Sequence, residues 1–174
     1  MKLRVASLVT MLMLCMSAQA LPVLNWSVSG PGGPTATTAG AETTFAYNAT
    51  PSFGAGYMAS SATVTEAGDY VFDYLFTGHH SWYLATAYLT TSDGGTLVNQ
   101  SASGGFSFSG SYTFTGVTAG QTIAFNFGGA NYDSSRLLQG QLVITQTSVP
   151  APGLLALFGL GIIGISIARR KVNG

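Results

Sequence analysis

The chain has 174 residues, of which 47% are hydrophobic and only 7% are charged, and six basic residues balance six acidic ones. The balance is uneven along the chain, because five of the six basic residues lie in the first 20 or the last 26 positions. Residues 21–148 carry six acidic residues against Arg136 alone, a net charge of −5. This acidic stretch has no basic surface for nucleic acid or anionic lipid, which excludes both as partners of the body.

The first 20 residues have the pattern of an export signal. Two basic residues precede an apolar stretch, residues 5–16, and small residues follow at Ala18 and Ala20. This order predicts a helical secretory signal peptide over residues 1–20, cleaved after Ala20. A buried N-terminal helix is the alternative, but such a helix does not require basic residues first, an apolar core next and small residues at its end.

The cysteine count bears on how the exported body is stabilised. The only cysteine, Cys15, lies inside the predicted signal peptide. Residues 21–148 therefore have no disulfide, although they are expected in an oxidising compartment. Their length is that of one domain, which can bury a core without covalent cross-links.

The last 26 residues, 149–174, fall into three parts. A proline pair comes first, an uncharged apolar run over residues 153–168 follows, and the chain then carries the basic residues Arg169, Arg170 and Lys171. Sixteen helical residues span roughly 24 Å, against about 30 Å of membrane hydrocarbon. A buried core helix is the alternative, but the basic stop favours a short transmembrane helix with residues 169–174 in the cytoplasm and the body outside.

This tail resembles the PEP-CTERM sorting signal of exported bacterial proteins, with alanine where the family usually has glutamate; the segment is Val149, Pro150, Ala151 and Pro152. The resemblance implies an inner-membrane intermediate and cleavage near the prolines by an exosortase-type membrane protease. It also implies a final place at the cell surface or outside the cell, and an association with exopolysaccharide. The body is then a non-catalytic structural or adhesive sandwich; a carbohydrate-binding module that acts on exopolysaccharide and a permanently anchored single-pass membrane protein are the alternatives.

The body has the two-residue periodicity of β-strands. In residues 69–76, aromatic side chains alternate with a second face that carries Asp69 and Asp73. Residues 30–40 and 128–135 are rich in glycine and predict a linker and a loop. We expect about nine short strands, at 23–28, 42–48, 69–76, 81–91, 96–99, 106–108, 112–114, 122–127 and 137–146.

Short strands separated by turns at this spacing predict an all-β fold, an antiparallel β-sandwich or jelly roll. The segment of residues 112–125 also resembles segments in the jelly-roll bodies of other proteins that carry such sorting signals. The predicted organisation is therefore a signal peptide, one sandwich domain and a membrane-sorting tail.

The acidic residues do not form a convincing catalytic pair. Asp69 and Asp73 are four residues apart on one strand, so their backbones are roughly 13 Å apart. Glycosidases need their two carboxyl groups about 5–9.5 Å apart. A pair that combines one of them with Glu66 or Asp133 across strands stays open, but we predict that the protein is not an enzyme.

Metal and glycan sites are predicted on loops. His79 and His80 are adjacent and point to opposite faces, which disfavours zinc. Oxygen ligands for calcium are offered by Asn126, Asn131 and Asp133, for which hydrogen bonding within a loop is the alternative. The aromatic residues proposed to contact glycans, for which core packing is the alternative, are Trp82, Tyr83 and Tyr132.

Overall fold

The computed structural model describes residues 23–49, 54–80, 85–131 and 137–148, and all regular structure in these ranges is β-strand. The strands are β1 (Ser27–Ser29), β2 (Thr35–Ala39), β3 (Glu42–Ala49), β4 (Gly54–Thr63), β5 (Gly68–His80), β6 (Thr86–Thr91), β7 (Thr96–Ser101), β8 (Gly104–Val117), β9 (Thr122–Asn131) and β10 (Leu138–Ser148).

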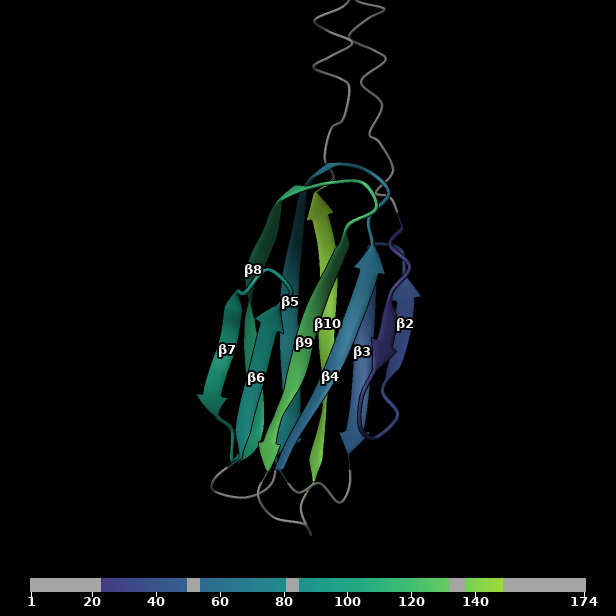
Figure 1. Cartoon of the computed structure of the whole chain (residues 1–174). Coiled ribbons are helices and arrows are strands. Elements are labelled where there is room, and N and C mark those ends of the chain that lie inside the picture. Colours follow the sequence, from purple (N-terminus) through teal and green to yellow (C-terminus); the bar gives the residue numbers. More distant parts are fainter. Residues whose placement is uncertain (1–22, 50–53, 81–84, 132–136, 149–174) are drawn as a thin grey trace, which may run out of the picture.

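The strands form two five-stranded sheets that face each other (Figure 1). One sheet has the order β1-β4-β9-β6-β7, and the other has the order β2-β3-β10-β5-β8. Every pairing between these strands is antiparallel. The predicted all-β sandwich of jelly-roll type is therefore confirmed.

Aromatic side chains from both sheets fill the space between them. The period-two prediction for residues 69–76 is confirmed: Tyr70, Phe72 and Phe76 are buried, while Asp69 and Asp73 face outward. Phe72 meets Phe125 of the opposite sheet edge to face, with ring centroids 5.6 Å apart. Such edge-to-face contacts stabilise a core beyond the area that it buries, by about 0.5–1.5 kcal/mol per pair.

Two segments predicted as irregular are strands. Residues 35–39, assigned to the linker, form the exposed edge strand β2, whose threonines pair with β3. The predicted loop 128–135 is wrong at its start, because β9 continues to Asn131. A Cβ atom on Gly129 would lie 1.9 Å from the Thr86 carbonyl oxygen, so this glycine allows close strand approach rather than a turn.

The prediction also differs from the structure at β4 and β8. The ten-residue strand β4, Gly54–Thr63, lies where no strand was predicted. The separate strands predicted at 106–108 and 112–114 are parts of the 14-residue β8, which runs through Gly110 without interruption. Glycine lowers strand propensity, but here the β5 partner holds the strand across it.

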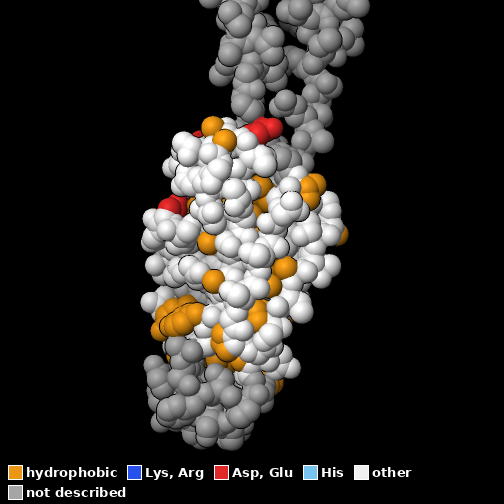
Figure 2. Space-filling view, turned by 45° about the vertical axis from the view of Figure 1, so that its right-hand side comes forward, with side chains coloured by type: hydrophobic (Ala, Val, Ile, Leu, Met, Phe, Trp, Pro, Cys, Tyr) orange, Lys and Arg blue, Asp and Glu red, His pale blue; other side chains and the backbone are white. Residues whose placement is uncertain are grey.

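The sandwich has two different ends. Val23 and Gln146 line one small pocket, so the two ends of the described body, Val23 and Ser148, lie at the same end, which we call the tail end. The strand residues that flank the ranges 50–53, 81–84 and 132–136 meet at the opposite end, which we call the loop end. The described acidic residues all lie in the tail-end half, and Figure 2 shows the visible ones near its top.

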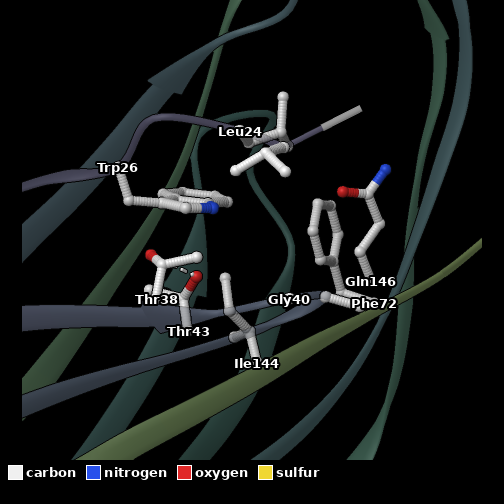
Figure 3. Close-up of a pocket in the computed structure, with 10 residues that line it drawn as sticks. Leu24, Trp26, Thr38, Gly40, Thr43, Phe72, Ile144 and Gln146 are labelled. Atoms are coloured by element: carbon white, nitrogen blue, oxygen red, sulfur yellow. Dashed lines mark hydrogen bonds between the residues drawn. The ribbon is translucent and has the colours of Figure 1, made fainter. Parts of the chain in front are cut away.

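A small pocket lies at the tail end, between the sheet that contains β3, β10 and β5 and the segment that precedes β1 (Figure 3). The rings of Trp26 and Phe72 stand on opposite sides of it, and the amide of Gln146 lies beside Phe72. Its volume of about 10 Å³ is that of one water molecule, too small for a sugar. Gln146 is 6% exposed, and its Nε2 atom has no hydrogen-bond partner among the described residues.

The terminal segments are not part of this description. The predicted signal peptide, with Ala18 and Ala20, and the predicted transmembrane range 153–168 lie outside the described residues. Within the described ranges, no helix has the length and apolar character to cross a bilayer.

Candidate functional site

A buried hydrogen-bonded pair lies beneath the loop end of the sandwich. His80 ends β5 with its side chain fully buried, and its Nε2 atom lies 2.8 Å from the Tyr47 hydroxyl oxygen in β3. The His80 Nδ1 atom lies 2.8 Å from the carbonyl oxygen of Thr86 at the start of β6. The pair therefore links both sheets next to the ranges 50–53 and 81–84.

These contacts fix the protonation of the neutral His80 ring. The Thr86 carbonyl can only accept, so Nδ1 carries the proton and donates it, and Nε2 accepts from the Tyr47 hydroxyl. Burial lowers the pKa of His80 from 6.5 to about 4, against the smaller opposing effect of the Thr86 carbonyl. Burial also raises the pKa of the Tyr47 hydroxyl. Both groups are uncharged near neutral pH.

Two glycines let this pair lie directly under the sheet backbone. Gly78 of β5 and Gly140 of β10 are register partners, and Gly140 is also the partner of Tyr47. A Cβ atom on Gly140 would lie 2.7 Å from the Tyr47 hydroxyl oxygen, and one on Gly78 would lie 2.7 Å from the Phe106 ring. The sheet floor above the Tyr47–His80 pair therefore consists of bare backbone.

A shallow, open groove of about 440 Å³ lies on the outer surface of this floor. The strand register places its polar side chains in two adjacent rows: Gln139 lies between Asn48 and His79, and Gln141 lies beside Thr77. We call these five residues the amide groove. The amide groove adjoins the loop end. The row of Asn48, Gln139 and His79 is one residue from the strand ends there, which are Ala49, Leu138 and His80.

The amide groove offers amide, hydroxyl and imidazole groups, without a carboxylate, lysine or arginine among its described residues. Among the described residues that line it there is no serine or cysteine. His80 lies below the sheet, with both nitrogens engaged by Tyr47 and Thr86. The arrangement suits a neutral, hydrogen-bonding ligand such as a polyol.

A second surface feature lies on the opposite sheet. Tyr57 of β4 and Tyr88 of β6 both pair with Gly128 of β9, and their ring centroids are 5.8 Å apart. Tyr57 is 50% exposed and forms the larger part of this Tyr57–Tyr88 platform. Because Gly128 carries no side chain, the two rings meet across it. The two rings are tilted by 48° against each other.

Two of the three residues predicted to bind calcium lie on the same strand. Asn126 lies within β9 as the partner of Ala59 and Thr90, and Asn131 ends the same strand. Their backbones are five residues apart, roughly 17 Å along the strand. Asp133 lies outside the described residues, and no cluster of three metal-ligating side chains occurs among those described.

The remaining predicted site residues fall mostly outside the description. Trp82, Tyr83 and Tyr132 lie in the ranges 81–84 and 132–136, whose flanking strand ends meet at the loop end. The tail residues Val149, Pro150, Ala151, Pro152, Arg169, Arg170 and Lys171 lie in the range 149–174.

Of the two carboxylates considered as a catalytic pair, one accepts a hydrogen bond within the fold and the other faces solvent. Asp69 accepts a hydrogen bond of 2.7 Å from the backbone nitrogen of Gly116 in β8. Asp73 faces solvent four residues along β5 and pairs with Thr145. They lie on the same face of β5, four residues apart.

Comparison with known families identifies the tail. The family model of the PEP-CTERM protein-sorting motif matches residues 148–171, from the last residue of β10 to Lys171. The chain carries a PEP-CTERM sorting motif. The PEP-CTERM match covers the predicted proline pair, the apolar run and the basic cluster, and it confirms the resemblance that these residues carry. No curated protein matches the chain.

The body is similar to solved carbohydrate-binding modules in its overall arrangement. TmCBM61, solved in complex with beta-1,4-galactotriose, has 15% identity and a TM-score of 0.41 over 70% of this chain and 88% of that one. CBM35 from Cellvibrio japonicus Abf62 has 8% identity and a TM-score of 0.38 over 76% and 91%. A family 35 module from an environmental isolate has 12% identity and a TM-score of 0.35 over 78% and 96%.

Sequence reasoning missed the amide groove and the Tyr57–Tyr88 platform. Both depend on residues far apart in the chain that the strand register brings together, such as Thr77 and Gln141. The available signal was the polar alternation of residues 137–146, where Gln139 and Gln141 share one strand face. Paired glycines at 78 and 140 gave no local indication that they oppose each other.

Proposed function

We propose that this protein is exported across the inner membrane, held there briefly by its C-terminal segment, and released by an exosortase-type protease to the cell surface or the extracellular matrix. In this proposal the sandwich is a non-catalytic structural or adhesive body. The PEP-CTERM match over residues 148–171 is the observation that carries the proposal.

The position of the motif in the fold supports this order of events. The motif starts where β10 ends, so the proposed cleavage segment, residues 149–152, directly follows the folded body. The tail end therefore faces the membrane while the protein is anchored. The amide groove lies near the other end of β5 and β10, roughly 20–30 Å away along the strands.

The mass of the mature protein tests the sorting proposal. The full chain is expressed in a bacterium that has the processing enzyme, and the C-terminus of the exported product is determined by mass spectrometry. We expect a product that lacks residues 153–174, and accumulation of an uncut membrane form when Pro150 and Pro152 are both changed to alanine. Thr147→Ala, one residue before the motif, is the control and should be cut normally. A wild-type product that still ends in Arg-Arg-Lys-Val-Asn-Gly would overturn the proposal.

A second proposal is that the body binds a neutral exopolysaccharide, and the amide groove is the observation that favours it. Amide and hydroxyl groups in two strand rows can exchange hydrogen bonds with sugar hydroxyls. No lysine or arginine is present among the described residues, so an acidic glycan would find no cationic partner there. Trp82, predicted from the sequence to contact glycans, follows His80 by two residues in the chain.

Affinity electrophoresis of the exported protein in gels containing neutral exopolysaccharide tests this second proposal. We expect Gln139→Ala combined with Gln141→Ala to weaken binding about tenfold, roughly 1.4 kcal/mol for the lost hydrogen bonds. Thr63→Ala, at the tail end of β4, should bind as the wild type does. If only Tyr57→Ala weakens binding, the platform is the site, and if no neutral polysaccharide retards the wild type, the binding proposal is wrong.

A further inference from the structure

The long edge strand β8 differs from the other sheet edges. The edge strands β1, β2 and β7 have three, five and six residues, whereas β8 has 14. In the described part of the chain, β5 is the only strand paired with β8 in its sheet, so one full side of β8 is an edge (Figure 1). Natural sandwiches usually keep their edge strands short or protect them by other means.

The sequence of β8 lacks the residues that normally block an edge. It contains no lysine, no other charged residue and no proline, and its outward face is made of serine and threonine. Its one irregularity is a bulge between Phe114 and Val117, with Gly116 in the left-handed region at a φ of 62°. The stretch before this bulge is regular and ready to accept another strand.

The side-chain pattern of β8 is symmetric about Gly110. Aromatic residues stand two and four positions away on both sides, namely Phe106, Phe108, Tyr112 and Phe114. Serine and threonine stand one and three positions away on both sides, namely Ser107, Ser109, Ser111 and Thr113. This symmetric stretch of residues 106–114 ends just before the bulge.

Such symmetry fits an antiparallel pairing of β8 with β8 of a second copy. With Gly110 on the two-fold axis, Phe108 of one copy faces Tyr112 of the other, and Phe106 faces Phe114. Aromatic residues then meet aromatic residues on the core side, and hydroxyl residues meet hydroxyl residues on the outer side. A shift by one residue would place aromatic residues opposite serine or threonine, and a shift by two would place Gly110 opposite an aromatic residue, so the pattern favours this register.

The core-side aromatics of β8 are also incompletely covered in one copy. Phe106 and Phe108 stack on each other with centroids 5.7 Å apart, and both are only partly buried. Pairing would extend the sheet from five strands to ten and bring the second copy's Phe114 and Tyr112 beside these rings. The added apolar contact and the main-chain hydrogen bonds both favour association.

We propose that two copies of this protein associate through β8, in an isologous antiparallel pair centred on Gly110. The two-fold axis closes this interface, because each copy uses the same edge and leaves no free β8. The proposal depends on strand length, composition and symmetry, and it holds whether or not the amide groove binds a glycan.

Site-directed cross-linking of the full chain in exporting cells tests the register. In a background where Cys15 is serine, two single variants are made, Ser107→Cys and Thr113→Cys. In the proposed register, residue 107 of one copy faces residue 113 of the other, while like residues are six positions apart, roughly 20 Å. Cells that express both variants together should give a covalent dimer after mild oxidation or treatment with a short thiol cross-linker. Cells that express either variant alone should give none.

A charge variant provides an independent measurement. Ser109→Lys with Ser111→Lys places four positive charges around the two-fold axis and should abolish the 107–113 cross-link. Thr37→Lys on β2, the opposite edge of the same sheet, is the matched control and should leave the cross-link unchanged. Absence of the dimer in the co-expressing cells, or equal dimer from either single variant, would overturn the proposed pairing.

Discussion

The buried His80 makes the stability of the sandwich depend on pH in a direction that the structure fixes. Its pKa falls from 6.5 to about 4 on folding, because burial disfavours the charged ring. The unfolded chain therefore binds a proton at a pH where the folded one does not. The neutral ring's contribution is complete above pH 6.5 and is lost as the pH falls from 6.5 towards 4.

The magnitude follows from the pKa difference. A shift of roughly 2.5 units corresponds to about 3 kcal/mol in total, of which about 2 kcal/mol is lost between pH 7 and pH 5. Equilibrium unfolding in urea at these two pH values measures this difference. The interval avoids most carboxylate titration, which begins at lower pH.

Two neighbouring histidines supply the test and its control. His80→Gln should lower the stability at pH 7 and remove most of the change between pH 7 and pH 5. His79→Gln, at the exposed neighbouring position, should keep the change. If the His80 variant loses as much stability on acidification as the wild type does, the buried neutral ring is not the cause and the reasoning fails.

Two further predictions concern positions where the packing decides the outcome. Gly129→Ala should destabilise the fold by at least about 2 kcal/mol, because its Cβ would lie 1.9 Å from the Thr86 carbonyl oxygen. In the control Gly105→Ala the nearest atom to the new Cβ is 3.9 Å away, so the free energy of unfolding should change by no more than about 0.5 kcal/mol. Thermal unfolding of the two variants compares them, and equal melting temperatures would contradict the close approach. Gln146→Met should raise the free energy of unfolding by about 1 kcal/mol, because it removes a buried amide nitrogen without a partner among the described residues. A less stable variant in urea unfolding would show that the amide nitrogen is satisfied.

The sequence predicted the class of the fold because alternation is a local property. Tyr70, Phe72 and Phe76 identified the buried face of β5 without knowledge of any neighbour. Glycine misled the same reasoning at residues 128–131, where it was taken as a sign of a loop. There the glycines meet opposing backbone across strands, as Gly129 meets Thr86, and that contact joins residues 43 positions apart.

The candidate site could be predicted only at its margins. Aromatic residues near the loop end and the sorting tail are visible as short sequence patterns, and the PEP-CTERM match confirms the tail. The amide groove joins three strands, and its rows exist only because β10 lies between β3 and β5. No local pattern determines that β10, the last strand, inserts between the third and the fifth.

This central place of β10 has a mechanical consequence. The sorting motif begins at the last residue of β10, so in the proposed anchored state tension on the tail would reach the body through that strand. Both neighbours run antiparallel to β10, and their hydrogen bonds lie across the direction of the pull. These bonds are loaded in shear, all at once rather than one after another as in an unzipping edge. In the anchored state that we propose, this arrangement would resist drag on the body until the tail is cut.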